Sequence, residues 1–409
     1  MDISLKLLIV FMVFMFFDPQ NILTFLEPLR LALLSGILVF LSVTSKVFSN
    51  FFKNSQSWLL FLFYLITAIS AFNSISWEIS KEGLISLLKC IILYFVMVTI
   101  LDSKATLEKF VWVLILFSGA NIIITLVFAK LGIYKTAWRL TSYFGGEGAG
   151  ANGYAMLLAS LLPLHFFSLE TQKSQKKKYF LILTILSFLL GIIRTRSRMG
   201  LGALILAILL ILWDKRKKAG TILFLALLIL VVITNTHQSS WERFDTISSE
   251  LSDKDETDAS VGGRMKLWKT AIFIMEDNLA LGTGINTFVK AKQEKYFYQA
   301  AGDFIHVPHN GFLSIGAEQG IFALIVFVLI ILLSIKDVWS VEIKLKGREE
   351  YLTIYNVAKS TRIGLVVFTV CLIFLSEHGS RILYTLIALS VSLKNIYQNK
   401  IDLEGLKKE

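Results

Sequence analysis

The sequence predicts an all-α integral membrane protein with about 12 transmembrane helices, both termini in the cytoplasm and one large outer loop that contains short helices. Three observations support this fold class. Hydrophobic residues make up 55% of the 409 residues, the mean hydropathy is +0.67, and there are only four prolines. Uncharged apolar runs of about 20 residues, the length that crosses a bilayer, recur along the chain. Soluble domains of this size do not carry such runs.

Polar breaks separate the apolar runs and so place the expected helices. The first run ends at Asp18-Pro19 without a small-residue cleavage site, so we expect a retained helix and not a signal peptide. The run at 57–72 is short and needs tight packing or extension into its flanks. The expected spans, in chain order, are 3–17, 30–48, 57–72, 83–101, 108–130, 151–169, 179–195, 198–213, 219–235, 309–334, 361–376 and 381–397.

These spans divide one membrane domain into three parts. Residues 1–235 carry transmembrane helices 1–9, residues 236–308 form the outer loop, and residues 309–409 carry helices 10–12 and a cytoplasmic tail. The loop turns amphipathic from Gly263 to Phe273, where apolar residues recur at helical spacing. We therefore expect a short helix in the loop that lies on the membrane.

Basic loops set the orientation. Lysines cluster in the short loops 173–178, 214–218 and 336–348 and in the C-terminal tail, and alternation from them places every basic loop inside. The membrane thereby explains the net charge of +11, and no nucleic-acid partner is expected. Cys90 and Cys371 each lie inside an apolar run, which argues against a disulfide or a zinc site.

The arginines are distributed differently. Eight of the eleven arginines fall on the outer face, against about ten of the thirty lysines, an asymmetry that the positive-inside rule does not predict. Guanidinium offers a planar fork for bidentate phosphate contacts, so an outer anion-binding surface is the economical explanation. Interfacial snorkelling is the alternative for any single arginine. The outer set is Arg30, Arg139, Arg194, Arg196, Arg198, Arg243, Arg264 and Arg381.

Three of these arginines lie in one hairpin between apolar helices, at Arg194, Arg196 and Arg198. Each would cost roughly 2.5–3.5 kcal/mol near the bilayer centre, so the hairpin must lie at the interface, line a wet cavity or face a bound anion. Diphosphate binding is the preferred interpretation, with a simple charged turn as the alternative. Farther upstream, Arg139 and Asn152 again place a cation and an amide before a helix on the outer side.

The segment from His306 to Leu313 carries the strongest candidate for catalysis. Pro308 suits the start of a helix, which places His309 and Asn310 at an N-terminal end. The helix dipole and the nearby arginines disfavour imidazolium, so His309 is available as a neutral general base. A structural or capping role remains open, as does metal binding by the His306-x-x-His309 pair. No carboxylate is adjacent, and we expect neither a metal nor a cofactor.

Other outer residues are supporting candidates. The turn at 376–381 contains Glu377, which could orient an arginine, and His378, a second candidate base, followed by Arg381. Glu318 is expected about half a bilayer deep, where a structural hydrogen-bond role is more plausible than catalysis. Gly282 and Gly284 lack the preceding strand and the lysine-serine ending of a nucleotide loop, so a turn is the preferred interpretation there.

Taken in order, these motifs resemble the O-antigen ligase and O-antigen polymerase superfamily of bacterial envelope glycosyltransferases. The similarity spans about residues 139 to 385. It rests on the arginine-serine-arginine hairpin that opens a helix, the Gly263-Arg264-x-x-x-Trp268 and Gly282-x-Gly284-x-x-x-Phe288 motifs, and His309-Asn310-x-x-Leu313.

The resemblance implies a metal-independent, inverting transfer of a glycan from undecaprenyl diphosphate. His309 would take the proton of the acceptor hydroxyl, and arginines would offset charge on the departing diphosphate. Arg196, Arg198 and Arg264 match the family positions best, while Arg139 and Glu377 are weaker matches. His306 matches an upstream histidine, although two residues separate the pair here where one is more usual.

The resemblance also implies a bacterial inner-membrane protein among membrane lipids, with the large loop and active site in the periplasm. Ligation of O-antigen to lipid A core is the first expectation. Polymerisation of repeat units onto a growing glycan is close behind, because the motifs are shared. A transporter or flippase for a lipid-linked anionic substrate is the alternative from another class.

Overall fold

The computed structural model describes residues 3–18, 23–51, 53–134, 138–145, 150–215, 261–298 and 305–401. These residues form helices and no strand, which agrees with the predicted all-α class. The α-helices are α1 (Ile3–Phe17), α2 (Leu31–Phe51), α3 (Ser55–Phe72), α4 (Trp77–Ile100), α5 (Lys104–Lys130), α6 (Ala151–Thr171), α7 (Gln175–Arg194), α8 (Arg198–Lys215), α11 (Val261–Asp277), α12 (Phe288–Glu294), α13 (Gly311–Gln319), α14 (Ile321–Leu345), α15 (Leu352–Leu372) and α16 (Arg381–Ile396). The short helices η2 (Thr24–Leu29), η3 (Glu349–Tyr351) and η4 (Tyr397–Ile401) complete them.

Five described helices are long and apolar enough to cross a membrane: α3, α4, α5, α6 and α14. Three further apolar stretches are shorter, at Ile3–Phe17, Leu31–Val47 and Arg198–Trp213. This composition indicates a multi-pass membrane protein. The total of about twelve spans and the orientation stay predictions, and the expected helix at 219–235 lies outside the described residues.

The core is centred on α6. Nearly every residue from Ala151 to Phe167 is buried, because α15, α7 and α8 pack around this helix. The contact with α15 is close: a Cβ on Gly364 would lie 2.6 Å from the carbonyl oxygen of Ser160. On the other side of α15, α14 packs on α15, α16 and α3, while α4 packs on α16, α2 and α3.

The expected continuous helix at 309–334 is wrong, because the chain breaks at Gly320 between α13 and α14. Gly320 has φ +88°, and a Cβ there would lie 2.2 Å from the carbonyl oxygen of Ala280. The last carbonyls of α13 accept hydrogen bonds from the backbone N–H groups of Thr283 and Gly284, at 3.1 and 2.7 Å. The preceding loop therefore replaces the next helical turn, and α13 lies outside the five candidate spans.

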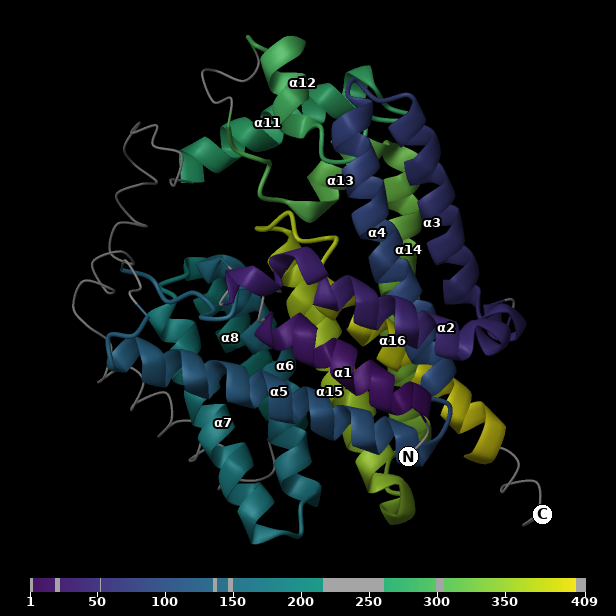
Figure 1. Cartoon of the computed structure of the whole chain (residues 1–409), viewed down its shortest axis with the longest axis vertical. Coiled ribbons are helices and arrows are strands. Elements are labelled where there is room, and N and C mark those ends of the chain that lie inside the picture. The colour runs from purple at the N-terminus through teal and green to yellow at the C-terminus, as the bar shows by residue number, and fades with distance from the viewer. Residues whose placement is uncertain are drawn as a thin grey trace.

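Helices α11, α12 and α13 gather at one end of the molecule, at the top of Figure 1, beside the ends of α3 and α4. We call residues 261–298 and 305–319 the cap. The helix expected between Gly263 and Phe273 is present as part of α11. The cap has its own small hydrophobic core, formed by Leu267, Ala271, Ile274, Phe288, Ala291, Tyr296 and Ala317. It is therefore a packed structure rather than a loose loop.

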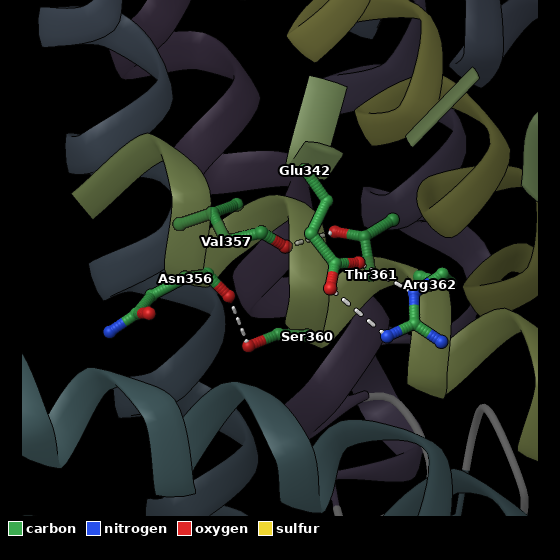
Figure 2. Close-up of polar contacts among 6 residues, drawn as sticks. All are labelled: Glu342, Asn356, Val357, Ser360, Thr361 and Arg362. Atoms are coloured by element: carbon green, nitrogen blue, oxygen red, sulfur yellow. Dashed lines mark hydrogen bonds and ion pairs between the residues drawn. The ribbon is translucent and has the colours of Figure 1, made fainter. Parts of the chain in front are cut away.

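The α6–α7 and α14–α15 turns lie at the end opposite the cap (Figure 1). Near the α14–α15 turn, the Arg362 guanidinium donates to both carboxylate oxygens of Glu342, at 2.6 and 3.2 Å (Figure 2). Close by, Lys394 of α16 donates to Asp337 of α14 at 3.0 Å, and Gln56 of α3 donates to the same carboxylate. These contacts connect α14 to α15, α16 and α3.

Candidate functional site

The arginine hairpin is a tight turn between α7 and α8. Its backbone folds back through a hydrogen bond from Arg196 N–H to the Ile193 carbonyl, and Arg196 takes a left-handed φ of +50°. Thr195 and Ser197 are buried, and the Ser197 hydroxyl accepts from Gly200 N–H at 3.0 Å, which caps α8. The turn thus buries its two hydroxyl side chains. The three arginines between and beside them are half-buried or exposed.

Arg139 holds this turn in place. Its Nε donates to the Thr195 carbonyl at 2.9 Å and its Nη2 to the Asn152 side-chain oxygen at 2.5 Å. The backbone N–H of Leu140 donates to the Arg194 carbonyl at 2.9 Å. The sequence predicted Arg139 as a diphosphate ligand. The structure shows contacts that support the neighbouring turn, a role that its position in the sequence did not indicate.

Arg264 of α11 comes close to the same turn. Burial and the charge of Arg198 both lower the pKa of the half-buried Arg264 guanidinium from its usual value, with burial the larger cause. The guanidinium of Arg196 lies 5.7 Å from the ring centre of Trp138 on the facing loop. Arginines from two segments, about 65 residues apart, therefore lie within electrostatic reach of one another. Arginine stays protonated in this setting, so this region is strongly cationic.

The same face of α11 reaches the segment that carries His309. Trp268 follows Arg264 by four residues, one helical turn, so the two side chains project from one face. The Trp268 indole N–H donates to the Pro308 carbonyl at 3.0 Å. Adjacent turns of α11 thus carry Arg264 and the Trp268 indole, and the indole holds Pro308, the residue before His309.

We call residues 305–310 the strap. His309 is half-buried with a left-handed φ of +50°, and its ring lies 6.4 Å from that of His306. Asn310 is buried, and its side-chain oxygen accepts from the backbone N–H groups of Phe312 and Leu313, both at 3.0 Å. Asn310 is therefore the N-cap of α13, and His309 stands immediately before that cap. At the other end of the strap, the Lys292 ammonium donates to the His306 carbonyl at 2.6 Å.

The turn between α15 and α16 packs beside the start of α13. Ser314 of α13 and Ser376 share a hydrogen bond of 2.8 Å. His378 is buried, and its Nδ1 has no hydrogen-bond partner among the described residues. Burial lowers the pKa of His378 to about 4, so its ring is neutral near pH 7. Glu377 is exposed, and Arg381 is the half-buried first residue of α16.

Glu318 has the structural hydrogen-bond role that the sequence predicted. Its two carboxylate oxygens accept from the backbone N–H groups of Asn286 and Phe288, at 3.1 and 3.0 Å. These groups are the entry to α12, so Glu318 ties α13 to α12. It lies inside the cap, near the C-terminal end of α13. Burial raises the pKa of Glu318 to about 7, against the lowering effect of the two amide donors.

Two residues of this region were missed by sequence reasoning about function. Lys292 is fully buried on α12, and Trp268 was recognised in a helical repeat and in the Gly263-Arg264-x-x-x-Trp268 motif but was given no role of its own. A buried lysine cannot be told from a surface lysine in a short amphipathic segment, so no sequence signal identified it. Among the described residues, no three His, Cys, Asp or Glu side chains cluster so as to hold a metal ion.

Comparison with known proteins agrees with this geometry. Residues 182–328 match the model of the family described as O-antigen ligase. The matched stretch contains the arginine hairpin, α11 and the strap, and it ends within α14. Arg139 and the turn at 376–381 lie outside it. A search of curated proteins found no match. The match supports the resemblance that the motifs predicted, over residues 182–328.

Proposed function

We propose that this protein is an O-antigen ligase-like glycosyltransferase of the bacterial inner membrane. It moves a glycan from undecaprenyl diphosphate to a sugar hydroxyl of lipid A core, at the periplasmic face and without a metal. The bond from the acceptor oxygen to the anomeric carbon forms as the bond from that carbon to the phosphate oxygen breaks. The acceptor proton passes to His309, and undecaprenyl diphosphate leaves. Attack from the face opposite the leaving group inverts the anomeric carbon.

The observation that carries the proposal is the position of Arg264, which lies within electrostatic reach of Arg198 of the hairpin and on the helix whose Trp268 donates to the Pro308 carbonyl. Two like charges in a partly desolvated place repel one another, and a bound anion relieves that repulsion. A diphosphate offers several oxygens to planar guanidinium forks and gains charge as the bond to the sugar breaks. Preorganised cations of this kind stabilise the leaving group as a divalent ion would.

The position of the strap supports His309 as the general base. The strap is fixed by the helix that carries Arg264, so the base and the cations share one support. His309 precedes the N-terminus of α13, where the helix dipole favours the neutral ring. A neutral imidazole can accept the acceptor proton, whereas an imidazolium cannot.

The orientation of the site follows from the charge pattern. The cap and the arginine hairpin lie away from the lysine-rich α6–α7 and α14–α15 turns, and lysine-rich loops remain in the cytoplasm. We therefore infer that the cap faces the periplasm and that both termini are cytoplasmic. Arg194, Arg196, Arg139 and Arg381 belong to the cationic surroundings of the donor diphosphate in this proposal, with His306 and Glu377 as supporting residues.

Reconstitution tests the proposal and separates its alternatives. Purified protein in liposomes receives lipid-linked donor alone, or donor with lipid A core, each with and without a chelator. Transfer to the core in the presence of chelator is the expected result. A ladder that grows on donor alone identifies a repeat-unit polymerase instead. Movement of donor across the bilayer without any glycosidic product identifies a flippase and contradicts the proposal.

A further inference from the structure

Lys292 is the least expected side chain of the cap. It lies on α12 with 0% of its surface exposed, and its Nζ donates to the His306 carbonyl at 2.6 Å. The ammonium also lies 5.3 Å from the ring centre of Phe288. Lysine is almost never fully buried unless it is paired, because removal of the charge from water is costly. The contact with the strap is therefore part of what holds this ammonium inside.

A second donor holds the strap from another helix. The Trp268 indole of α11 donates to the carbonyl of Pro308, two residues after the carbonyl held by Lys292. In an extended segment, residues two apart point the same way. The carbonyls of His306 and Pro308 can therefore both face α11 and α12. Two side chains from two helices thus fix the strap at alternate positions.

The fixed strap determines the backbone of His309. A left-handed φ at a non-glycine residue costs of order 1–3 kcal/mol and persists only where the surroundings impose it. Here the restraints stand on both sides: the held carbonyls of His306 and Pro308 come before His309, and the Asn310 cap comes after it. The helix that carries Lys292 is itself anchored by Glu318, which accepts from Phe288 N–H at 3.0 Å. The support of the strap is therefore itself tied to α13.

We propose that Lys292 and Trp268 are positioning residues that aim the general base His309 at the acceptor hydroxyl. The inference rests on the proposed role of His309 and adds to it the two side chains that set its direction. Neither residue needs to touch donor or acceptor for this role. Removal of either contact releases the strap, so proton transfer becomes slower while donor affinity is retained.

The test uses Lys292→Met, which keeps the length of the side chain and removes the ammonium, and Trp268→Phe, which removes only the indole donor. We expect kcat to fall about 10- to 100-fold in Lys292→Met and about 5- to 10-fold in Trp268→Phe, with the donor KM unchanged. Lys292→Arg, which restores a donor, should recover part of the loss. Lys290→Met is the matched control, since Lys290 lies on the same helix and pairs with Glu294 at 3.6 Å.

A double-mutant comparison separates positioning from general damage to the fold. In a His309→Ala background the base is absent, so adding Trp268→Phe should leave the residual rate unchanged. A further loss there, or a donor KM that rises while kcat is kept, overturns the inference. If Lys292→Met does not fold, Trp268→Phe alone decides. Full activity of His309→Ala contradicts the proposed base instead, whereas an inactive His309→Ala with normal Lys292 and Trp268 variants contradicts only the positioning role.

Discussion

Where α14 meets α15 and α16, Arg362 and Lys394 pair with carboxylates of the same chain. The arginines near the cap differ: Arg139 contacts a carbonyl and an amide, and Arg264 lies within electrostatic reach of Arg198. Arg362 donates twice to Glu342, and Lys394 donates to Asp337 (Figure 2 draws the first pair). Arg362 and Lys394 each have a negative partner that the fold supplies. The pairs join helices and need no bound molecule to be stable.

The cap end is arranged in another way. Arg139 donates to a carbonyl and an amide, Arg196 lies over the indole of Trp138, and Arg264 is close enough to Arg198 for its pKa to be lowered. Like charges that are brought together raise the free energy of the empty site. In the proposed function, the first set of cations serves the fold and the second set serves a bound anion. Changes at the two ends should therefore have opposite effects on stability and activity.

The largest expected effect is that of His309→Ala at the cap end. We expect product formation to fall about 10²- to 10⁴-fold, the usual contribution of a general base, while donor binding is retained. Transfer rates in proteoliposomes and donor binding at equilibrium measure the two quantities separately. Arg348→Ala is the control, because Arg348 is exposed at the opposite end. A near-normal rate in His309→Ala, together with a large loss in His378→Ala, would assign the base to His378.

The next effect is that of Arg264→Ala. Hydrogen bonds to charged groups contribute about 1.5–3 kcal/mol, so donor affinity should weaken about 10- to 100-fold. Arg264→Lys keeps the charge and loses the fork, and we expect an intermediate affinity. Removing one of two repelling cations should leave thermal stability unchanged or slightly higher. If Arg264→Ala and Arg348→Ala weaken donor binding equally, the cap is not the diphosphate site.

Much of this comparison could be predicted from the sequence. Apolar runs predicted helices, and five described helices are long and apolar enough to cross a membrane. The density of arginines predicted a shared anion-binding surface for the hairpin and α11, which are about 65 residues apart in the chain, and that surface stays a prediction. The resemblance based on the same motifs is supported over residues 182–328.

What the sequence did not reveal depends on long-range contacts. The break at Gly320 arises because residues 279–284 take the place of a helical turn, and nothing within the apolar run itself indicates that replacement. The contacts of Arg139 with Thr195 and Asn152 require the folded chain, so the sequence did not reveal its support of the hairpin. Lys292 was missed for the same reason, since burial is a property of packing and not of residue type.

Glu342→Ala tests the comparison at the end of the molecule opposite the cap. It leaves the half-buried Arg362 guanidinium without its carboxylate, and we expect a loss of about 2 kcal/mol in the free energy of unfolding. Transfer activity per folded molecule should stay near that of the wild type. Denaturant unfolding and the transfer assay measure the two effects. The double variant Glu342→Leu/Arg362→Met should recover part of the stability, because no buried charge then lacks a partner. A large loss of donor affinity in Glu342→Ala would mean that this pair also serves the site.

The smallest expected effect concerns Glu318, the buried carboxylate of the cap. Its pKa in the folded protein is about 7, above the ordinary value of 4.5, so the folded state favours the protonated form. The associated stability is complete below about pH 4.5 and is lost as the pH rises through about 7. By linkage, the loss between about pH 6 and about pH 8 is roughly 1 kcal/mol. Unfolding midpoints measured across this range should fall in the wild type.

Glu318→Gln removes this ionisation while keeping one acceptor oxygen for the entry to α12, so its unfolding midpoint should be flatter over the same pH range. Glu294→Gln is the matched control, because Glu294 is an exposed carboxylate on the neighbouring α12 and should retain the wild-type slope. An unchanged slope in Glu318→Gln would show that Glu318 ionises as easily as a surface carboxyl. The hydrogen bonds from the backbone N–H groups of Asn286 and Phe288 would still anchor α12, because an ionised carboxylate also accepts them. A flatter slope would instead show that the cap holds its one buried carboxyl for structure, as the opposite end holds Glu342.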